Sequence, residues 1–288
     1  MVKLELSEQY DKIEEIPAYG FSGREDLEEI ILPGSVRKIG RYAFYNCRNL
    51  RKITFYSHIQ DVGSGAFTGC HQVCHLDVTI VPGKPSCLKD FLQELTEEMM
   101  VDYRVEAPRV QRSDESDRKC AQEYARLMFP EYFEEGVENT PARILMTQIH
   151  GSGLKYRNCF YRTEFQFQEY DVRFPYAEAV ESPHFLMEMV LGRLMYPLHL
   201  SEKAGKMYET YLRDHLTDIG KRLIQEKDAP RLVWLAEHYL DEEAQAEELL
   251  NEAGRQGAAE CTGCLMEWRR RKFGGRNRQK SGIPDFEF

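Results

Sequence analysis

Apolar and small residues recur every 23 positions through the first eighty residues, the mark of a stacked repeat. The rows of the repeat are Gly20, Ala43 and Ala66; Phe21, Phe44 and Phe67; Leu27, Leu50 and Val73; Ile30, Ile53 and Leu76; Leu32, Phe55 and Val78; Ile13, Val36 and Ile59; and Ile16, Ile39 and Val62. Leu4 lies 23 residues before Leu27, which indicates a partial first coil.

Each coil is predicted to contain a short strand, near residues 28–32, 51–55 and 74–78, in which side chains alternate between two faces. Successive coils then stack their strands in parallel, about 4.8 Å apart. The small residue before each Phe lets the ring turn inward, so we expect a phenylalanine ladder opposite the sheet. Gly40 and Gly63 suit a tight turn after each Ile39-type position.

The stretch LEEIILPGSVRKIGRYAFYNCRNLRKITF, from Leu27 to Phe55, resembles the BspA-like class of leucine-rich repeat. The resemblance covers about residues 13–78 and implies a solenoid with a tendency to bind proteins and no common catalytic site. The chain departs from the family pattern at Arg24, which stands in the row of Cys47 and Cys70. It departs again at residues 82–86, so the end coils are expected to be caps.

The open end of the solenoid is predicted to be closed by a helix near residues 86–99 and a strand near 101–106, because an uncapped end exposes apolar surface. The polar stretch 107–118 contains a proline and predicts a boundary, giving a solenoid domain over 1–110 and a mostly helical domain over 111–288. The fold class is therefore α+β, a short solenoid of parallel strands followed by helices.

Two sequences in the second part are typical helix starts, Thr140-Pro141 and Ser182-Pro183, and Gly151 to Gly153 is expected to end the first helix. The aromatic residues between Tyr156 and Phe174 recur at helical spacings and suit one helical face in an aromatic core. A base-stacking platform is the alternative use of such rings. Residues 216–271 are predicted to form short helices, some of them paired.

Composition narrows the classes of function. The net charge is −10, and acidic residues outnumber basic ones in both 1–110 and 111–288, so neither part is a basic nucleic-acid module. Eight cysteines without an export signal at the start indicate reduced thiols and a cytoplasmic location. The most apolar segment, Leu186 to Leu200, is interrupted by charges and Pro197 and is too short to span a membrane.

Three motifs carry possible chemistry, and each has a structural explanation. Cys70 to His75 offers four metal-capable side chains, but Cys74 and His75 are strand neighbours and point to opposite faces. Cys261 and Cys264 have redox spacing without a preceding strand. Gly83 to Ser86 lacks the earlier glycine of a phosphate-binding loop. We therefore expect no catalytic residue, no metal site and no cofactor.

The run from Arg269 to Lys280 holds seven positive and no negative charges. A solvated, irregular tail from about residue 269 is the preferred interpretation, and binding to nucleic acid or an acidic protein is the alternative.

The outward strand positions form the remaining candidate site, with opposite charges on neighbouring strands. The predicted binding residues are Glu29, Ile31, Lys52, Thr54, Tyr56, His75 and Asp77. The leading hypothesis is an intracellular protein-interaction or scaffold protein, not an enzyme, whose partner is an unidentified protein. The alternative is a nucleic-acid-associated protein that uses the basic tail.

Overall fold

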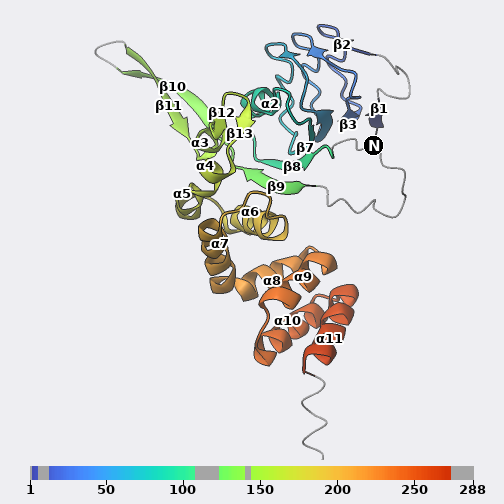
Figure 1. Ribbon diagram of the computed structural model, residues 1–288, viewed down its shortest axis with the longest axis vertical. Helices are drawn as coiled ribbons and strands as arrows, with labels where there is room; N and C mark the ends of the chain where they lie inside the picture. The colour runs from blue at the N-terminus through green and yellow to red at the C-terminus, as the bar shows by residue number, and fades with distance from the viewer. Residues whose placement is uncertain (1, 6–12, 108–122, 140–143, 274–288) are drawn as a thin grey trace, which may run out of the picture. The chain divides into compact units, whose positions relative to one another are not determined.

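The computed structural model describes residues 2–5, 13–107, 123–139 and 144–273. Its contacts divide the chain into two compact units, Met1–Lys206 and Met207–Phe288. The first unit contains the solenoid and a set of short helices and hairpins, and the second contains helices (Figure 1). The predicted order, a parallel-strand solenoid followed by a mostly helical region, is confirmed. The boundary near residue 110 stays a prediction, since residues 108–122 lie outside the described part.

The main sheet has six strands, and five of them run parallel. In spatial order they are β1 (Val2–Glu5), β3 (Leu27–Ile31), β5 (Lys52–Tyr56), β7 (His75–Ile80), β8 (Met99–Val105) and β9 (Tyr124–Phe129). Ile30 pairs with Ile53 and Ile53 with Leu76, as the repeat predicts, and Val101 of β8 continues that row. The β8 strand therefore belongs to a further coil, in which helix α2 (Leu88–Glu94) occupies the turn.

A second, smaller sheet joins the turns of successive coils. It consists of β2 (Glu15–Ile16), β4 (Lys38–Ile39) and β6 (Asp61–Val62), all parallel. A Cβ on Gly63 would lie 2.5 Å from the backbone nitrogen of Arg41, and one on Gly40 would meet the backbone of Ala18 in the same way. Glycine is required here because the preceding coil approaches the chain closely, not because of a left-handed backbone.

The predicted phenylalanine ladder is present and fully buried in its middle. The rings of Phe21 and Phe44 stack 5.4 Å apart, and those of Phe44 and Phe67 are also 5.4 Å apart. Phe91 of α2 supplies the next ring, 5.1 Å from Phe67, and also stacks on Phe55 at 4.0 Å. Helix α2, which lies within the range 86–99 predicted for a helix, thus closes the core with the ring of Phe91.

A buried arginine fastens this closing coil to the segments that follow it. Arg157 lies on α3 (Gly153–Arg157) and is fully buried. Its Nε donates to the carbonyls of Leu92 and Leu95 at 2.9 and 3.1 Å, and its Nη2 donates to Glu97 O at 2.6 Å. Its Nη1 donates to the carbonyl of Pro130, just after β9. Burial lowers the pKa of Arg157 to about 10, so the guanidinium still carries its charge at neutral pH.

The segment after β9 begins with a hairpin rather than a helix. Strands β10 (Phe133–Asn139) and β11 (Ile144–His150) pair antiparallel, so the helix predicted from Thr140-Pro141 to Gly151 is wrong. Ile144, Thr147 and Ile149 favour a strand, and residues 133–139 provide its partner. Gly151 to Gly153 leads into α3 instead of ending a helix.

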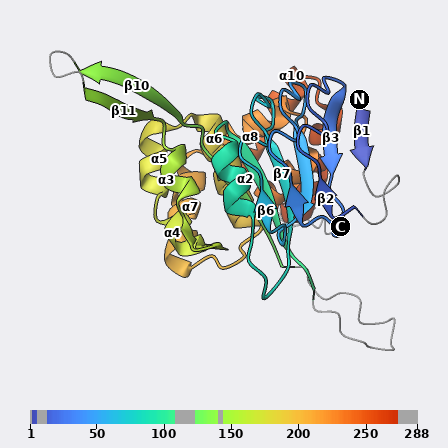
Figure 2. The same ribbon diagram turned by 90° about the horizontal axis from the view of Figure 1, so that it is seen from above.

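The aromatic stretch forms a core from several short elements. They are α3, the hairpin of β12 (Phe160–Tyr161) with β13 (Glu164–Phe165), α4 (Phe167–Asp171) and α5 (Phe174–Val180). The single helical face predicted for 156–174 is therefore wrong, and Arg162, at φ 55°, makes the turn that breaks it. The rings still pack together, with Tyr156 edge-on to Tyr170 at 5.0 Å. Both views place α3, α4 and α5 on the side of α2 away from β1 and β3 (Figures 1 and 2).

Helix α6 (Pro183–Met195) begins as Ser182-Pro183 predicts. The hydroxyl of Ser182 accepts the N–H of Phe185 at 3.2 Å, and proline occupies the first turn. Arg193 near its end forms two 2.9 Å hydrogen bonds to the buried carboxylate of Asp171.

The second unit consists of paired helices, in agreement with the sequence. After α7 (Glu202–Asp214), which crosses the boundary, come α8 (Leu216–Gln225), α9 (Ala229–Tyr239), α10 (Glu243–Arg255) and α11 (Ala259–Phe273). Helix α8 contacts α9 and α10, and α11 contacts α9 and α10. Residues 269–273 belong to α11, so an irregular tail does not start at 269.

The ladder makes Phe44→Ala a sensitive test of the solenoid. Phe44 is fully buried between two stacked rings, so we expect the change to lower the free energy of unfolding by about 3–5 kcal/mol in urea denaturation. Tyr161→Ala is the control, since that ring is 64% exposed, and it should change stability by no more than about 0.5 kcal/mol. Equal effects of the two changes would mean that the ladder is not part of the core.

Candidate functional site

The predicted binding residues lie on the outward face of the main sheet. On β5, Ile53 and Phe55 are fully buried, whereas Lys52, Thr54 and Tyr56 between and beyond them are partly exposed. Glu29 and Ile31 on β3 and His75 on β7 are also partly exposed, and Asp77 is only 7% exposed. The structure thus brings all seven residues to one face of three neighbouring strands.

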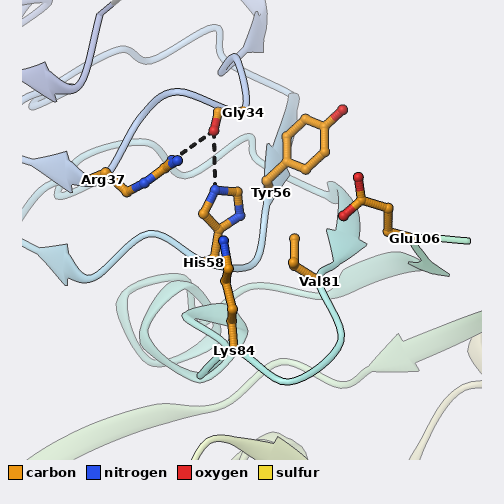
Figure 3. A pocket seen from close by; sticks show the side chains of 7 residues that line it. All are labelled: Gly34, Arg37, Tyr56, His58, Val81, Lys84 and Glu106. Carbon is orange, nitrogen blue, oxygen red and sulfur yellow. Dashed lines mark hydrogen bonds between the residues drawn. The ribbon is translucent and has the colours of Figure 1, made fainter. Parts of the chain in front are cut away.

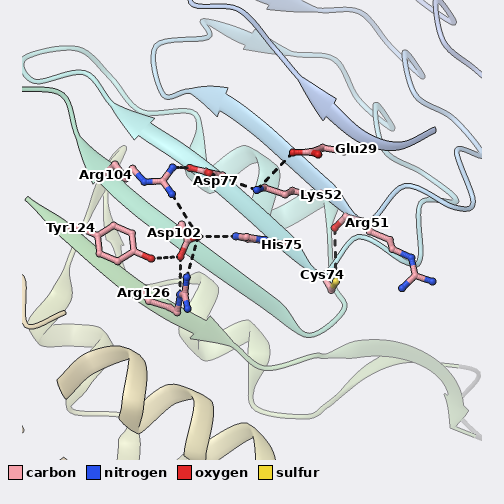
Figure 4. Close-up of polar contacts among 10 residues, drawn as sticks. All are labelled: Glu29, Arg51, Lys52, Cys74, His75, Asp77, Asp102, Arg104, Tyr124 and Arg126. Carbon is pink, nitrogen blue, oxygen red and sulfur yellow. Dashed lines mark hydrogen bonds and ion pairs between the residues drawn. The ribbon is translucent and has the colours of Figure 1, made fainter. Parts of the chain in front are cut away.

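Their charges form a chain of ion pairs across the strands (Figure 4). The ammonium group of Lys52 lies 3.7 Å from Glu29 on one side and 3.9 Å from Asp77 on the other. Arg104 of β8 continues the chain by pairing with Asp77, and it lies 3.8 Å from Asp102. Because positive and negative charges alternate, the face has little net charge, and its side chains hold one another in place.

Asp102 on β8 is the centre of this network, and the sequence did not identify it. Its side chain is 4% exposed and accepts hydrogen bonds from His75 Nε2 at 2.9 Å, Arg126 Nε at 2.8 Å and the hydroxyl of Tyr124. Since a carboxylate accepts, Nε2 of His75 carries the proton in this contact. Three donors from two neighbouring strands therefore converge on one buried acid.

The electrostatics keep Asp102 ionised. Burial by itself would raise the pKa of the carboxyl, but the hydrogen bonds from His75, Arg126 and Tyr124 outweigh burial and hold the pKa well below its usual range. Burial likewise opposes the charge on Arg126, and the bond to Asp102 outweighs it and raises the pKa of the guanidinium. The Asp102 carboxylate therefore stays charged near neutral pH and fixes the neighbouring strands through its hydrogen bonds.

One end of the outward face is covered by α6. The ring of Tyr196, just after α6, lies edge-on to Tyr124 at 4.5 Å, and the guanidinium of Arg126 lies 5.7 Å from the Tyr196 ring centre. A Cβ on Gly192 would come within 2.9 Å of Arg126 O, so α6 lies close on β9. The part left accessible comprises Glu29, Ile31, Lys52, Thr54 and Tyr56, which we name the open strand face.

The four residues between Cys70 and His75 that could bind a metal point to different partners. The thiol of Cys70 is buried and donates to Phe44 O at 3.0 Å, His71 lies 2.7 Å from Glu97, and Cys74 is exposed. His75 bonds to Asp102 instead. Within the ranges that the structure describes, no three His, Cys, Asp or Glu side chains are grouped as metal ligands. In α11, Cys261 is buried and Cys264 partly exposed, both as free thiols.

None of the described helices combines the length and apolar character needed to cross a bilayer.

Asp102 should make the solenoid sensitive to acid. The pKa of Asp102 is lower in the folded protein than in the unfolded chain, where it is about 3.9. The Asp102 charge therefore contributes its full stabilisation above about pH 5, and this stabilisation is lost as the pH falls towards the folded pKa. We expect Asp102→Asn to cost about 3 kcal/mol at pH 7, because it leaves Arg126 without its buried acid. The difference from the wild type should shrink below about pH 4.

Urea denaturation at several pH values measures this difference directly. Asp26→Asn is the matched control, because Asp26 bonds Arg24 at an exposed position, and it should have a much smaller effect at every pH. A wild-type advantage over Asp102→Asn that stays constant down to pH 2 would show that the network does not depend on the Asp102 charge.

Comparison with known proteins agrees with the repeat and the fold. The family model described as "BspA type Leucine rich repeat region" matches residues 3–82 in six copies. The match begins at β1, which confirms the partial first coil inferred from Leu4, and ends just after β7. No curated protein matches the chain, and no solved structure matches it. Residues 3–82 of this chain therefore belong to the BspA-type leucine-rich repeats.

Proposed function

We propose that the protein binds another protein through the open strand face. The repeat family indicates a protein-interaction or surface-repeat role. The observation that carries the proposal is the arrangement of this face. Ile31 and Thr54 pair across β3 and β5, with Glu29 and Lys52 beside them, all partly exposed on strands whose opposite side is buried. Protein interfaces commonly have an apolar centre with polar and charged groups around it. Ile31 and Thr54 provide such a centre, and Glu29 and Lys52 provide the charged groups.

The rigidity of the face supports this proposal. Lys52 is held between Glu29 and Asp77, so its side chain is ordered before a partner arrives. A preorganised surface loses less conformational entropy on binding than a mobile one. The ion-pair network thus has a role in recognition as well as in stability.

The size of the face limits the kind of partner. Two strands, β3 and β5, lie about 4.8 Å apart and are five residues long, at about 3.3 Å per residue, so they present roughly 160 Å². A stable protein interface needs about 800 Å² from each partner. The open strand face therefore suits a short segment of the partner.

The basic run offers less support for the nucleic-acid alternative. Arg269 lies 2.7 Å from Glu243, Arg271 3.1 Å from Glu237, and Lys272 3.1 Å from Asp241. These cations of α11 pair with acids of α9 and α10 or the loop between them, which leaves less free positive charge for phosphates. Residues 274–288 lie outside the described part.

The cysteines support a location in a reducing compartment such as the cytoplasm. Those in the described residues are free thiols, and Cys74 is exposed. The thiols of Cys47 and Cys70 donate to Phe21 O and Phe44 O at 3.1 and 3.0 Å, so reduced sulfur has a structural role in the coils. An oxidising compartment would favour disulfides over such thiols.

A paired charge change tests the open strand face. Ile31→Glu with Thr54→Arg places opposite charges on directly paired strand positions, so we expect the free energy of unfolding to change by less than about 1 kcal/mol. The same change alters both the charge and the shape of the proposed interface. Proteins captured from native lysate by the wild type should be lost to this variant, as measured by quantitative mass spectrometry.

The control carries the same pair of charges elsewhere on the solenoid. Ser22→Glu with Ser64→Arg changes exposed turn positions away from the sheet and should keep the captured proteins. Retention of every captured protein by the strand-face variant would place binding elsewhere on the chain.

A further inference from the structure

A polar pocket of about 400 Å³ lies where the strands of successive coils pass into their turns (Figure 3). Its lining residues are Gly34, Arg37, Tyr56, His58, Val81, Lys84 and Glu106. A second hollow of about 370 Å³ shares Arg37, His58 and Lys84 with it. The combined space falls in the size range of sites for small molecules.

One backbone carbonyl organises two of the lining side chains. Arg37 Nη1 donates to Gly34 O at 2.7 Å and to Val36 O at 2.9 Å, and His58 Nε2 lies 3.1 Å from the same Gly34 oxygen. A carbonyl oxygen only accepts, so Nε2 of His58 carries a proton. Both side chains are thus held in place by protein contacts that do not use all of their nitrogen atoms.

The other ring nitrogen of His58, Nδ1, is buried and makes no hydrogen bond within the part of the chain that the structure describes. Nearly all buried polar atoms in proteins have a partner, so such an atom calls for an explanation. Burial, reinforced by the nearby charges of Arg37 and Lys84, lowers the pKa of His58, and the ring is therefore neutral near pH 7.

The charges around the ring define what could bind there. Arg37 and Lys84 contribute positive charge and only hydrogen-bond donors, and no ion pair of Lys84 occurs among the described residues. In Figure 3 the Lys84 ammonium lies next to the His58 ring, whereas the Glu106 carboxylate lies beyond Tyr56. The part of the pocket around Arg37, His58 and Lys84 is thus suited to a ligand that accepts hydrogen bonds and carries negative charge.

We propose that this pocket binds the phosphate group of a small molecule between Arg37, His58 and Lys84, with the ring of Tyr56 beside the rest of the ligand. Phosphate is favoured over carboxylate because it carries nearly two negative charges and three acceptor oxygens. Arg37 and Lys84 match that charge, and the neutral His58 ring takes up a proton at Nδ1 in order to donate to the phosphate. This site is separate from the open strand face, apart from Tyr56, which borders both.

Binding should change the protonation of His58. The titratable groups that act on the ring are Arg37, Lys84 and Glu106. A bound phosphate offsets the two cations and provides an acceptor for Nδ1–H, so the pKa of His58 should rise when phosphate binds.

Titration of the full chain with inorganic phosphate tests the proposal, with the imidazole nitrogens of His58 followed by NMR. We expect a saturable shift at Nδ1 and a weaker affinity, by at least about tenfold, in Lys84→Met. Lys84 is exposed, so this variant should keep the wild-type unfolding midpoint. Lys89→Met, on α2 and outside the lining, is the matched control and should bind phosphate like the wild type.

A parallel titration with acetate tests whether the pocket prefers a phosphate group to a carboxylate group. Acetate should bind at least about tenfold more weakly than phosphate, since it carries a single charge. The proposal is overturned by a His58 signal that does not respond to phosphate, by equal affinities for acetate and phosphate, or by a Lys84→Met variant that binds phosphate as the wild type does.

Discussion

The stacking of phenylalanine rings in the core is the contact on which the rest of the solenoid depends. Phe21, Phe44 and Phe67 follow one another at equal 5.4 Å separations, and Phe91 continues the stack from a helix. Such regular spacing keeps each coil in the same register as the last. That register aligns the outward side chains into rows, brings Lys52 between Glu29 and Asp77, and places Arg37, His58 and Lys84 of three coils around one pocket.

The last coil is closed by polar contacts that leave few buried groups unsatisfied. Arg157 donates hydrogen bonds to four backbone carbonyls around α2 and β9 that would otherwise need water as a donor. These bonds offset the large cost of burying the charge of Arg157. The hydroxyl of Tyr170 donates to Met128 O at 2.7 Å and accepts from Met128 N at 2.9 Å, so it pairs with the outer edge of β9. These two bonds cap the outward backbone groups of Met128, so another strand cannot pair with β9 at that residue.

The repeat made most of the solenoid predictable, because the pattern of apolar and small residues in each coil recurs at the same positions in two other coils. Elements that occur once were not predictable in this way. β9 adds to β8 in the antiparallel sense after residues 108–122, and no row of the repeat contains it. Asp102 was missed because α2 lengthens its coil, so that Val101 follows Leu76 by more than the repeat length.

Lys84 looked like part of an incomplete phosphate loop, and only the folding of three coils brings it next to Arg37 and His58. Thr140-Pro141 is a helix-start sequence between two strands, where hairpin pairing overrides local propensity.

We expect the ladder, the closing coil and β9 to form one cooperative unit that holds the outward face rigid. Native-state amide hydrogen exchange can measure this cooperativity, because it gives an opening free energy for each strand. The amides of β9 that bond to β8 should exchange with the same opening free energy as those of β5 and β7, to within about 1 kcal/mol. Opening of β9 several kcal/mol below β5 and β7 would contradict this expectation, since the closing segment would then be a separate, weakly attached element.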